Sequence, residues 1–472
     1  MRTRGPRSPA SRRGSPVPRP WTATPRAALC LGYDAPPGGA AVDAPGAARG
    51  NPLAGERAAP PVENTIAALT AFPIGLSLLW NSIHPLLLPI LLAGLVAPGL
   101  QNTALSTLTF VGLVVAMVTQ PLAGALSDRA RLPFGRRHPL IALGALLSVV
   151  ILGAMALFGP TSLVALAGLY TLLQVTMNVA LAAHQALIPD LVPAHRRGIA
   201  GGARSFGDIL GIIVGTLVVT TMVEQGGVAA GIGATALGLF LAAGATLIWV
   251  REGWGGLPTP VATVGAGRWF DPGAFRLGKN APPEFRRALV GRLLFVVAMT
   301  SVQSFAFNFI RDVLDVGEPL EVYRGMVTGI GVAILVACLP AGAMFDRFGH
   351  RIPTLVASAL GAVGCALMIT AADAAAVTAY GVLVGAGMGL FIASNWALLT
   401  RIVPTAEAAR YMGLTNLATA GGAALARFNG PLIDGINSVV ADLGYRVMLA
   451  EAALLFLGGG VVLATVRAVR SR

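Results

Sequence analysis

Charged residues and cysteines are scarce in this chain of 472 residues. Only 12% of the residues are Asp, Glu, Lys or Arg, about half the share of a typical soluble domain, while 55% are hydrophobic. A conventional soluble globule is therefore not expected. The three cysteines, Cys30, Cys338 and Cys365, have neither the CxxC pattern nor a metal-type spacing, so we expect no disulfide framework, no metal site and no cofactor.

Motifs for enzymatic chemistry are also absent from the sequence. It contains no HExxH, no G-x-S-x-G and no soluble catalytic domain, which disfavours an enzyme. A phosphate-binding loop ends in G-K-[ST], but the single lysine lies in Gly278-Lys279-Asn280 without the required upstream glycine. ATP-driven transport is therefore excluded.

Long hydrophobic runs, by contrast, recur from Ile66 onward. A helix needs about 20 mostly apolar residues to cross the hydrocarbon core of a bilayer. Twelve stretches meet this length: 66–93, 104–125, 139–158, 161–187, 199–223, 228–250, 289–311, 324–345, 352–371, 374–399, 411–435 and 445–466. We predict an all-α polytopic membrane protein with twelve transmembrane helices.

The basic residues test this topology, because cytoplasmic loops carry an excess of Lys and Arg. With an even number of spans and both termini in the cytoplasm, 20 basic residues fall in cytoplasmic breaks or the C-terminal tail and three, Arg311, Arg324 and Arg446, in outer ones. An odd number of spans would destroy this separation. We expect a multi-pass protein of the cell membrane with both termini cytoplasmic, surrounded by lipid, monomeric and without a nucleic-acid partner.

The break at 251–288 divides the spans six and six, and two patterns repeat across it. Residues 186–187, 192–193 and 202 recur at an offset of 211, and Gly124 with Asp128-Arg129 recurs as Gly342 with Asp346-Arg347 at an offset of 218. Such repeats indicate two pseudo-symmetric bundles. The expected organisation is a disordered Arg- and Pro-rich arm at 1–63, bundles at 64–250 and 289–467, a cytoplasmic loop at 251–288 and a tail at 468–472.

The repeated loop motif carries a family resemblance. Both copies fit G-x-x-x-D-R followed by glycine and basic residues, and the twelve-helix pattern with this loop resembles the major facilitator superfamily over about 64–467. The resemblance implies that the loop latches the two halves together on the cytoplasmic side in the outward-facing state. The implied gating residues are Gly124, Asp128, Arg129, Gly135, Arg136, Arg137, Gly342, Asp346, Arg347 and Gly349.

A finer resemblance follows from the spacing of Asp128 and Gly135, which is longer than that of Asp346 and Gly349. The expanded loop, with Asn178 and the run from Asp190 to Pro193, resembles the glycoside-pentoside-hexuronide:cation symporters and the plant-type sucrose transporters. Ala183 and Gln185 depart from the sucrose carriers, which disfavours sucrose itself. The helix at 104–125 lacks the carboxylate of melibiose-type carriers, which disfavours sodium.

Polar residues on the expected first, fourth, seventh and tenth spans are candidates for a substrate cavity, because superfamily sites lie near the midplane between the halves. Asparagine, glutamine, histidine and tryptophan predominate, which suits a neutral polyhydroxylated solute, although polar bonds between packed helices would use the same residues. The candidates are Trp80, Asn81, His84, Gln174, Asn178, Gln185, Gln303, Asn308, Asn395 and Trp396, and Ser301 and Ser304 share the stripe of Asn308.

Ionisable residues inside a span are costly and are candidates for coupling. Asp208 lies roughly 15 Å into the fifth span, and Arg204 precedes it by one turn. Asp208 could carry a proton, or it could form a static ion pair with Arg204. His84 is the other candidate for proton coupling, since imidazole titrates in the physiological range, although a structural histidine is the more common case and the adjacent Pro85 favours a local helix break.

These observations predict a secondary active transporter that moves a sugar or glycoside by alternating access with proton symport. The alternative is a proton-coupled efflux antiporter for small amphipathic compounds. Gly202, Gly211 and Gly215 match the first positions of the antiporter signature, but Thr216, Val219 and Thr220 do not match the rest.

Overall fold

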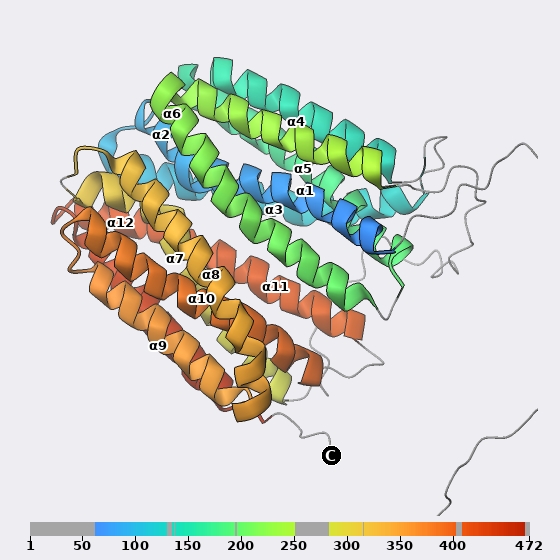
Figure 1. Cartoon of the computed structure of the whole chain (residues 1–472). Coiled ribbons are helices and arrows are strands. Elements are labelled where there is room, and N and C mark those ends of the chain that lie inside the picture. Colours follow the sequence, from blue (N-terminus) through green and yellow to red (C-terminus); the bar gives the residue numbers. More distant parts are fainter. Residues whose placement is uncertain are drawn as a thin grey trace, which may run out of the picture. The chain divides into compact units, whose positions relative to one another are not determined.

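The structure is a computed structural model that describes residues 62–129, 135, 137–193, 196–250, 283–314, 316–402 and 408–467. Within these ranges all regular secondary structure is helical (Figure 1). The first half contains α1 (Val62–Ser82), α2 (Leu88–Ala93), α3 (Gln101–Arg129), α4 (His138–Phe158), α5 (Leu163–Leu191) and α6 (Arg197–Trp249). The second half contains α7 (Pro283–Val313), α8 (Pro319–Phe348), α9 (Arg351–Met368), α10 (Ala374–Ile402), α11 (Ala408–Ala426), α12 (Asn429–Asn437) and α13 (Leu443–Ala464).

The helices account for the twelve predicted crossings. Ten helices of the described ranges are long and apolar enough to cross a membrane. One of them, α6, has 53 residues and turns back at Gly227, whose φ of 72° is a conformation that glycine adopts without strain, so it supplies two crossings. The pair α11 and α12 forms one more path that breaks at Arg427 and Phe428. The predicted all-α fold is confirmed.

One helix starts earlier than its hydrophobic run suggests. The structure begins α7 at Pro283, whereas the sequence predicts a span from 289. Proline suits the first turn of a helix because its missing N–H has no partner there. Arg292, counted above with the basic break, therefore lies well inside α7.

The two halves use matching helix contacts. In the first half α5 packs against both α3 and α4, and in the second half α10 packs against both α8 and α9. The helices of each half form a group, blue to green for the first and yellow to red for the second (Figure 1). This correspondence is what a duplicated six-helix unit predicts.

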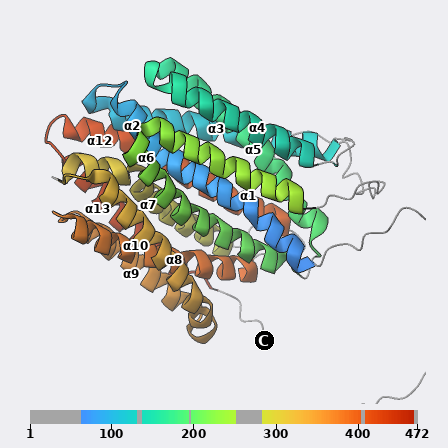
Figure 2. The same cartoon turned by 45° about the horizontal axis from the view of Figure 1, so that its top comes forward.

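Glycines allow the closest helix contacts in each half. A Cβ at Gly211 of α6 would collide with the carbonyl of Ile74 in α1, and Ser77 of α1 donates a 2.5 Å hydrogen bond to the carbonyl of Asp208. Figure 2 shows α1 and α6 running side by side. In the second half a Cβ at Gly385 would lie 2.7 Å from the carbonyl of Ile330 in α8. Small residues bring helix backbones together in membranes.

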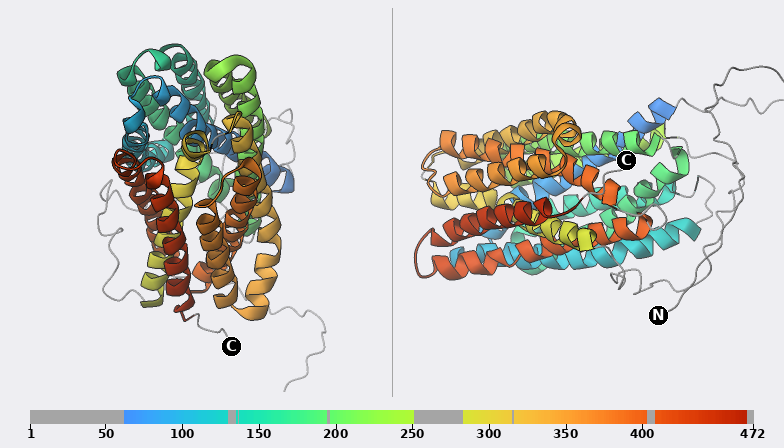
Figure 3. Two further views of the ribbon diagram at one scale, coloured as in Figure 1. Left: turned by 90° about the vertical axis from the view of Figure 1, so that its left-hand side faces the viewer. Right: turned by 90° about the horizontal axis from the view of Figure 1, so that it is seen from below.

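Among the described residues, most polar contacts between the halves lie at one end of the bundle. We name this the α2–α3 end, because α2 finishes and α3 begins there, and the opposite end the α3–α4 end. At the α2–α3 end the contact of α3 with the second half is mainly with α12, and Arg324 of α8 forms a 2.7 Å ion pair with Glu224 of α6. Within the second half, α13 packs against α7; Figure 3 shows α13, in dark red, beside the yellow start of α7.

The outer surface of the bundle is apolar, as a bilayer requires. Large hydrophobic side chains are exposed along the lengths of the helices, for example Val150, Leu157, Val164 and Leu454. Their exposure has no stabilising explanation in water, whereas lipid tails solvate them. The chain is therefore a multi-pass membrane protein, as its hydropathy predicted.

Candidate functional site

The first span is interrupted where its polar residues lie. A π-helical segment, Ile83–Leu87, separates α1 from α2 and contains His84 and Pro85. Proline cannot donate the ordinary helical hydrogen bond, and single π turns often occur at functional positions. The ring of His84 stacks on Trp80 with centroids 5.0 Å apart and planes 12° apart.

A hydrogen-bonded row of polar side chains extends from His84 into α5 and α3. His84 Nε2 lies 2.9 Å from the hydroxyl of Tyr170, and Gln174 donates a 2.6 Å bond to the same hydroxyl. Asn178 donates to the backbone carbonyl of Gln174 at 2.7 Å, and Gln120 donates to Asn178 at 2.9 Å. We call these five residues the polar row.

The three α5 residues of the polar row are buried, His84 and Gln120 are partly exposed, and the five side chains hydrogen-bond to one another. Gln174 and Asn178 are buried, and the spacing of four residues from Tyr170 through Gln174 to Asn178 puts all three on one face of α5. Gln185, predicted on the same stripe, is exposed near the end of the helix. The structure thus joins two of the three predicted residues of this helix with His84.

The second half contributes a polar stripe on α7. Ser304 accepts a 2.6 Å hydrogen bond from Arg427, and Ser301 accepts a 2.8 Å bond from Asn429. Arg427 and Asn429 flank the break between α11 and α12. Binding sites of transporters are often built at such interrupted helices.

Asn81 and Gln303 connect the two halves directly. Gln303 donates a 2.6 Å hydrogen bond from Nε2 to Oδ1 of Asn81, and Asn81 in turn donates to the carbonyl of Ser77. Both were predicted from different helices as cavity residues. The contact shows that the first and seventh spans approach each other at this level.

Asn395 and Trp396, the two residues predicted on the tenth span, lie in different environments. Asn395 is buried and accepts a 2.5 Å bond from Arg292, which also donates to Thr419 at 3.0 Å. This contact joins α7, α10 and α11. Trp396, in contrast, is 46% exposed, so its ring is available to a solute or to lipid.

Asp208 and Arg204 are close but loosely paired. Arg204 Nε lies 3.9 Å from Asp208 Oδ2, beyond hydrogen-bond distance, and the Asp208 side chain is 42% exposed. A static ion pair would have a shorter contact and less exposure. The carboxylate is therefore accessible, whereas its backbone carbonyl is held by Ser77.

A network of polar side chains closes the α2–α3 end. Asn102 of α3 donates to Asp434 of α12 at 2.8 Å and to Tyr445 of α13 at 3.0 Å, while Asn308 of α7 donates to Asn102 at 2.7 Å. Tyr445 also donates a 2.5 Å bond to Asp312. We call these residues the end closure. Asn308, predicted for the cavity, is part of it.

The loop motif is described in part. Arg137 is buried and donates to Asp190 at 3.0 Å and to Ser127 at 2.7 Å, which joins the ends of α3 and α5 within the first half. Gly135 and Gly349 have φ values of 99° and 71°, so the repeated glycine has the same backbone role in both loops. A Cβ at Gly124 would meet nothing within 4 Å, so close helix approach does not explain that glycine.

For most of the other residues of the loop motif, the structure describes only the backbone or nothing. Arg347 is exposed and its guanidinium lies 5.2 Å from the ring centroid of Phe348. Arg136 lies outside the described residues. The backbones of Asp128, Arg129, Gly342 and Asp346 belong to helices, and their side chains are outside the description.

Several polar residues that the structure joins are not among the candidates predicted from the sequence. Tyr170 is the centre of the polar row, yet a tyrosine in an apolar helix gives no distinctive pattern. Asp434 and Glu451 did offer a signal, because intramembrane carboxylates are rare and usually engaged. Glu451 of α13 hydrogen-bonds to Asn429, which links it to Ser301.

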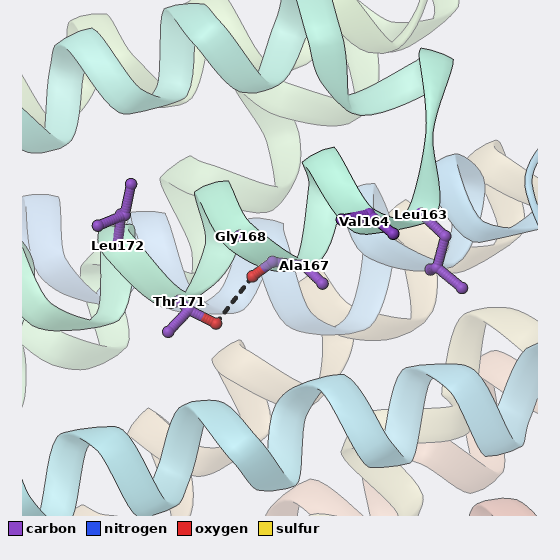
Figure 4. Close-up of a pocket in the computed structure, with 6 residues that line it drawn as sticks. All are labelled: Leu163, Val164, Ala167, Gly168, Thr171 and Leu172. Carbon is purple, nitrogen blue, oxygen red and sulfur yellow. Dashed lines mark hydrogen bonds between the residues drawn. The ribbon is translucent and has the colours of Figure 1, made fainter.

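An apolar groove of about 620 Å³ lies along the surface of α5 (Figure 4). The one hydroxyl on its wall, that of Thr171, donates to the carbonyl of Ala167, as the dashed line shows. Val164 is 82% exposed there. This surface offers no group that would hold a polar solute, and we assign it to lipid contact.

Comparison with known proteins identifies the family. A profile described as the Major Facilitator Superfamily matches residues 65–426, well over half of the chain. The chain belongs to the Major Facilitator Superfamily. Members of this superfamily are membrane-embedded transporters of small molecules rather than enzymes, and many of them couple transport to protons. The predictions of a transporter and of a non-enzyme are thereby confirmed at this level.

Individual relatives are distant. Multidrug resistance protein MdtG of Enterobacter lignolyticus (strain SCF1) is 25% identical over 358 residues, which cover 74% of this chain and 79% of that protein. The crystal structure of a D-xylose-proton symporter has a TM-score of 0.64 at 17% identity and covers 87% of this chain and 98% of that one. The nucleoside transporter NupG has a TM-score of 0.63 at 16% identity, with coverages of 85% and 97%. These structures show the fold.

Proposed function

We propose that this superfamily member is a proton-coupled symporter that imports a small solute with several hydroxyl groups, of the sugar or glycoside class. The observation that carries the proposal is the polar row. Its amides, phenol and imidazole form one connected set, with the face of Trp80 beside it. Such groups can exchange hydrogen bonds with hydroxyls, and an indole can stack on a sugar ring.

The proposed transport path requires that one end of the bundle faces the cytoplasm and the other the extracellular side. The excess of arginine supports a cytoplasmic α3–α4 end, and with this orientation the end closure would seal the extracellular side. Ten residues of the closed end connect the halves through hydrogen bonds or ion pairs: Gln101, Asn102, Thr103, Thr221, Glu224, Asn308, Arg311, Arg324, Asp434 and Tyr445. The conformation is then inward-facing, with the solute released toward the α3–α4 end. The latch at Asp128, Arg129, Arg136 and Arg137 would form in the opposite state.

We assign proton coupling to Asp208. Its carboxylate is accessible and only loosely paired with Arg204, which allows it to take up and release a proton as the path alternates. His84 is less suited to this role, because its ring is fixed between Trp80 and Tyr170. It serves instead to position Tyr170.

Efflux of amphipathic compounds is the second candidate, favoured by the name of the relative MdtG. Two of the three glycines that suggested an antiporter have a packing explanation. Cβ atoms at Gly211 and Gly215 would collide with Ile74 and Leu78 of α1, whereas at Gly202 nothing lies within 4 Å. Close packing of α1 and α6 requires Gly211 and Gly215 whichever way the solute moves.

Proteoliposomes with an imposed proton gradient test the proposal. A panel of labelled sugars and glycosides is offered outside, with and without an uncoupler, to protein of known orientation. We expect uptake of at least one solute that exceeds equilibration and that the uncoupler abolishes. Uptake that ignores both the gradient and the uncoupler would exclude symport. Loss of preloaded amphipathic dyes driven by an inwardly directed proton gradient, without sugar uptake, would establish the second candidate.

A further inference from the structure

Arg427 occupies an unusual position in the membrane-spanning region. It lies at the break between α11 and α12, opposite α3 of the other half. There it lines a cavity of about 160 Å³ together with Ser106, Thr107, Phe110, Phe428 and Pro431. This volume is below the roughly 300–1,000 Å³ of complete ligand pockets, so the cavity suits one functional group of a larger solute.

The guanidinium of Arg427 is incompletely satisfied. Nη1 donates to Ser304 at 2.6 Å, whereas Nε is buried and has no hydrogen-bond partner. Across the described part of the chain no carboxylate forms an ion pair with Arg427; the carboxylate of Glu451 hydrogen-bonds to Asn429. A buried cation without a counter-ion is costly, so a protein that keeps one usually uses it to bind an anion.

One further feature favours a negative charge at this place, and another relates it to the polar row. The first turn of α12 begins two residues after Arg427, and the N-terminal end of a helix carries a partial positive charge. Ser106, Thr107 and Phe110 of α3 line the cavity of Arg427, and farther along the same helix a Cβ at Gly112 would lie 2.6 Å from the ring of Tyr170. Helix α3 therefore runs past both the cavity of Arg427 and the polar row.

We propose that the transported solute carries an anionic group, a carboxylate, which binds Arg427 while the polar row holds its hydroxyl groups. This inference rests on the proposed function, in that the space between the halves is the transport path. The solute is then a hydroxylated organic acid rather than a neutral sugar. Arginine suits this task, because its planar donors match a carboxylate in a bidentate geometry.

Matched pairs of an acid and its neutral polyol test the proposal on the purified full-length protein. D-gluconate is compared with D-sorbitol, and D-galactonate with galactitol, at constant ionic strength, by thermal stability and isothermal titration. We expect at least one acid to raise the melting temperature in a saturable way, with its polyol at least tenfold weaker. Equal effects of acid and polyol, no effect of any acid, or equal stabilisation by sulfate or by anionic lipid at the same concentration would each overturn the proposal.

Two variants separate the site from a general charge effect. In Arg427→Gln the dissociation constant of the acid should rise at least tenfold, and in Arg427→Lys it should rise less. Arg446→Gln, at an exposed arginine of the same half, should leave it unchanged. An Arg427→Gln protein that binds the acid normally contradicts the proposal.

A labelling experiment covers the case in which Arg427→Gln does not fold. Thr107→Cys, with Cys30, Cys338 and Cys365 replaced by alanine, is treated with an anionic and a cationic methanethiosulfonate. Beside the intact Arg427 the anionic reagent should react at least tenfold faster relative to its rate with free thiol. Equal relative rates would overturn the proposal.

The outcomes distinguish this inference from the proposed function. Proton-driven uptake of a neutral sugar without binding of any acid leaves the symport proposal standing and removes this one. Binding of an acid that depends on Arg427, without proton-driven uptake of any solute, supports the anion site and removes the symport proposal.

Discussion

Asn308 donates a 2.7 Å hydrogen bond from its Nδ2 to Oδ1 of Asn102, and these two asparagines belong to opposite halves of the bundle. Both are buried, and Asn102 is at the same time bonded to Asp434 and Tyr445. A buried polar group that loses its partner costs about 1–3 kcal/mol. The end closure is therefore both a source of stability for this conformation and the set of bonds that must break when the end opens.

A methyl group added at Gly430 tests whether tight packing at this position keeps the α2–α3 end closed. A Cβ there would collide with the hydroxyl of Ser106 and the carbonyl of Asn102. Overpacking of this kind costs about 1–3 kcal/mol, so Gly430→Ala should shift the population toward the state open at the α2–α3 end by roughly 5- to 150-fold. Spin labels at the exposed positions Leu100 and Ala441 would report the opening by electron–electron distance measurement.

Gly435→Ala is the matched control for this variant. It makes the same change on the same helix, but at a position where a Cβ would meet nothing within 4 Å. Its distance distribution should equal that of the parent protein. If Gly430→Ala also leaves the distribution unchanged, the contact of α3 with α12 does not control closure.

Tyr170→Phe should disrupt the polar row. The hydroxyl that is lost accepts a bond from Gln174 and pairs with His84, so both partners would be left unsatisfied in a buried site. We expect the KM for the transported solute to rise at least tenfold, with the melting temperature lowered by a few degrees. Tyr380→Phe, which removes a phenol outside the row, should change neither value. Unaltered transport by Tyr170→Phe would remove the row from the path.

Arg137→Gln should destabilise the first half of the bundle. The arginine is buried, and its bonds to Asp190 and Ser127 join the ends of α3 and α5; hydrogen bonds to charged groups contribute about 1.5–3 kcal/mol. Because the Asp190 side chain is 28% exposed, solvent screening favours the lower part of that range. Arg347→Gln at the equivalent loop of the second half should cost less than about 1 kcal/mol, since Arg347 is exposed. If thermal unfolding shows that the two variants lose equal stability, the hydrogen bonds of Arg137 contribute no more than the exposed side chain of Arg347.

Asp208→Asn distinguishes coupling from structure. If the carboxylate carries the proton, the variant should lose accumulation against a gradient while exchange of solute across the membrane continues. The alternative is a static pair with Arg204, which predicts that Asp208→Asn and Arg204→Gln lower the melting temperature alike and that both retain accumulation. Uptake and counterflow in the same proteoliposomes separate these results.

The number of membrane crossings could be predicted because it depends on local properties of the chain. Each span shows as a run of apolar residues, and the arginines between spans separate by side. Even the crossing hidden inside the continuous helix α6 was visible, because the apolar run is interrupted near Gly227. The repeat at Gly135 and Gly349 was visible for a similar reason, since a positive φ selects glycine directly.

The partners of the polar residues could not be predicted in the same way. Ser304 and Asn308 share a stripe on α7, but Ser304 bonds to Arg427 and Asn308 to Asn102 across the closed end. Which neighbour each residue meets depends on helix rotation and on the interruptions at 83–87 and 427–428. Hydropathy does not encode either quantity.

The sequence by itself determined a membrane protein with two six-helix halves, and the family resemblance that it showed is confirmed. Only the tertiary structure decided that Tyr170 is the centre of a hydrogen-bonded row and that Arg427 lines a cavity in which no carboxylate of the described residues pairs with it. The physical reason is the difference between local interactions and interactions that join residues far apart in the sequence. Burial in lipid acts on every residue of a span through its own composition, whereas a hydrogen bond or an ion pair requires two side chains that only the packed helices bring together.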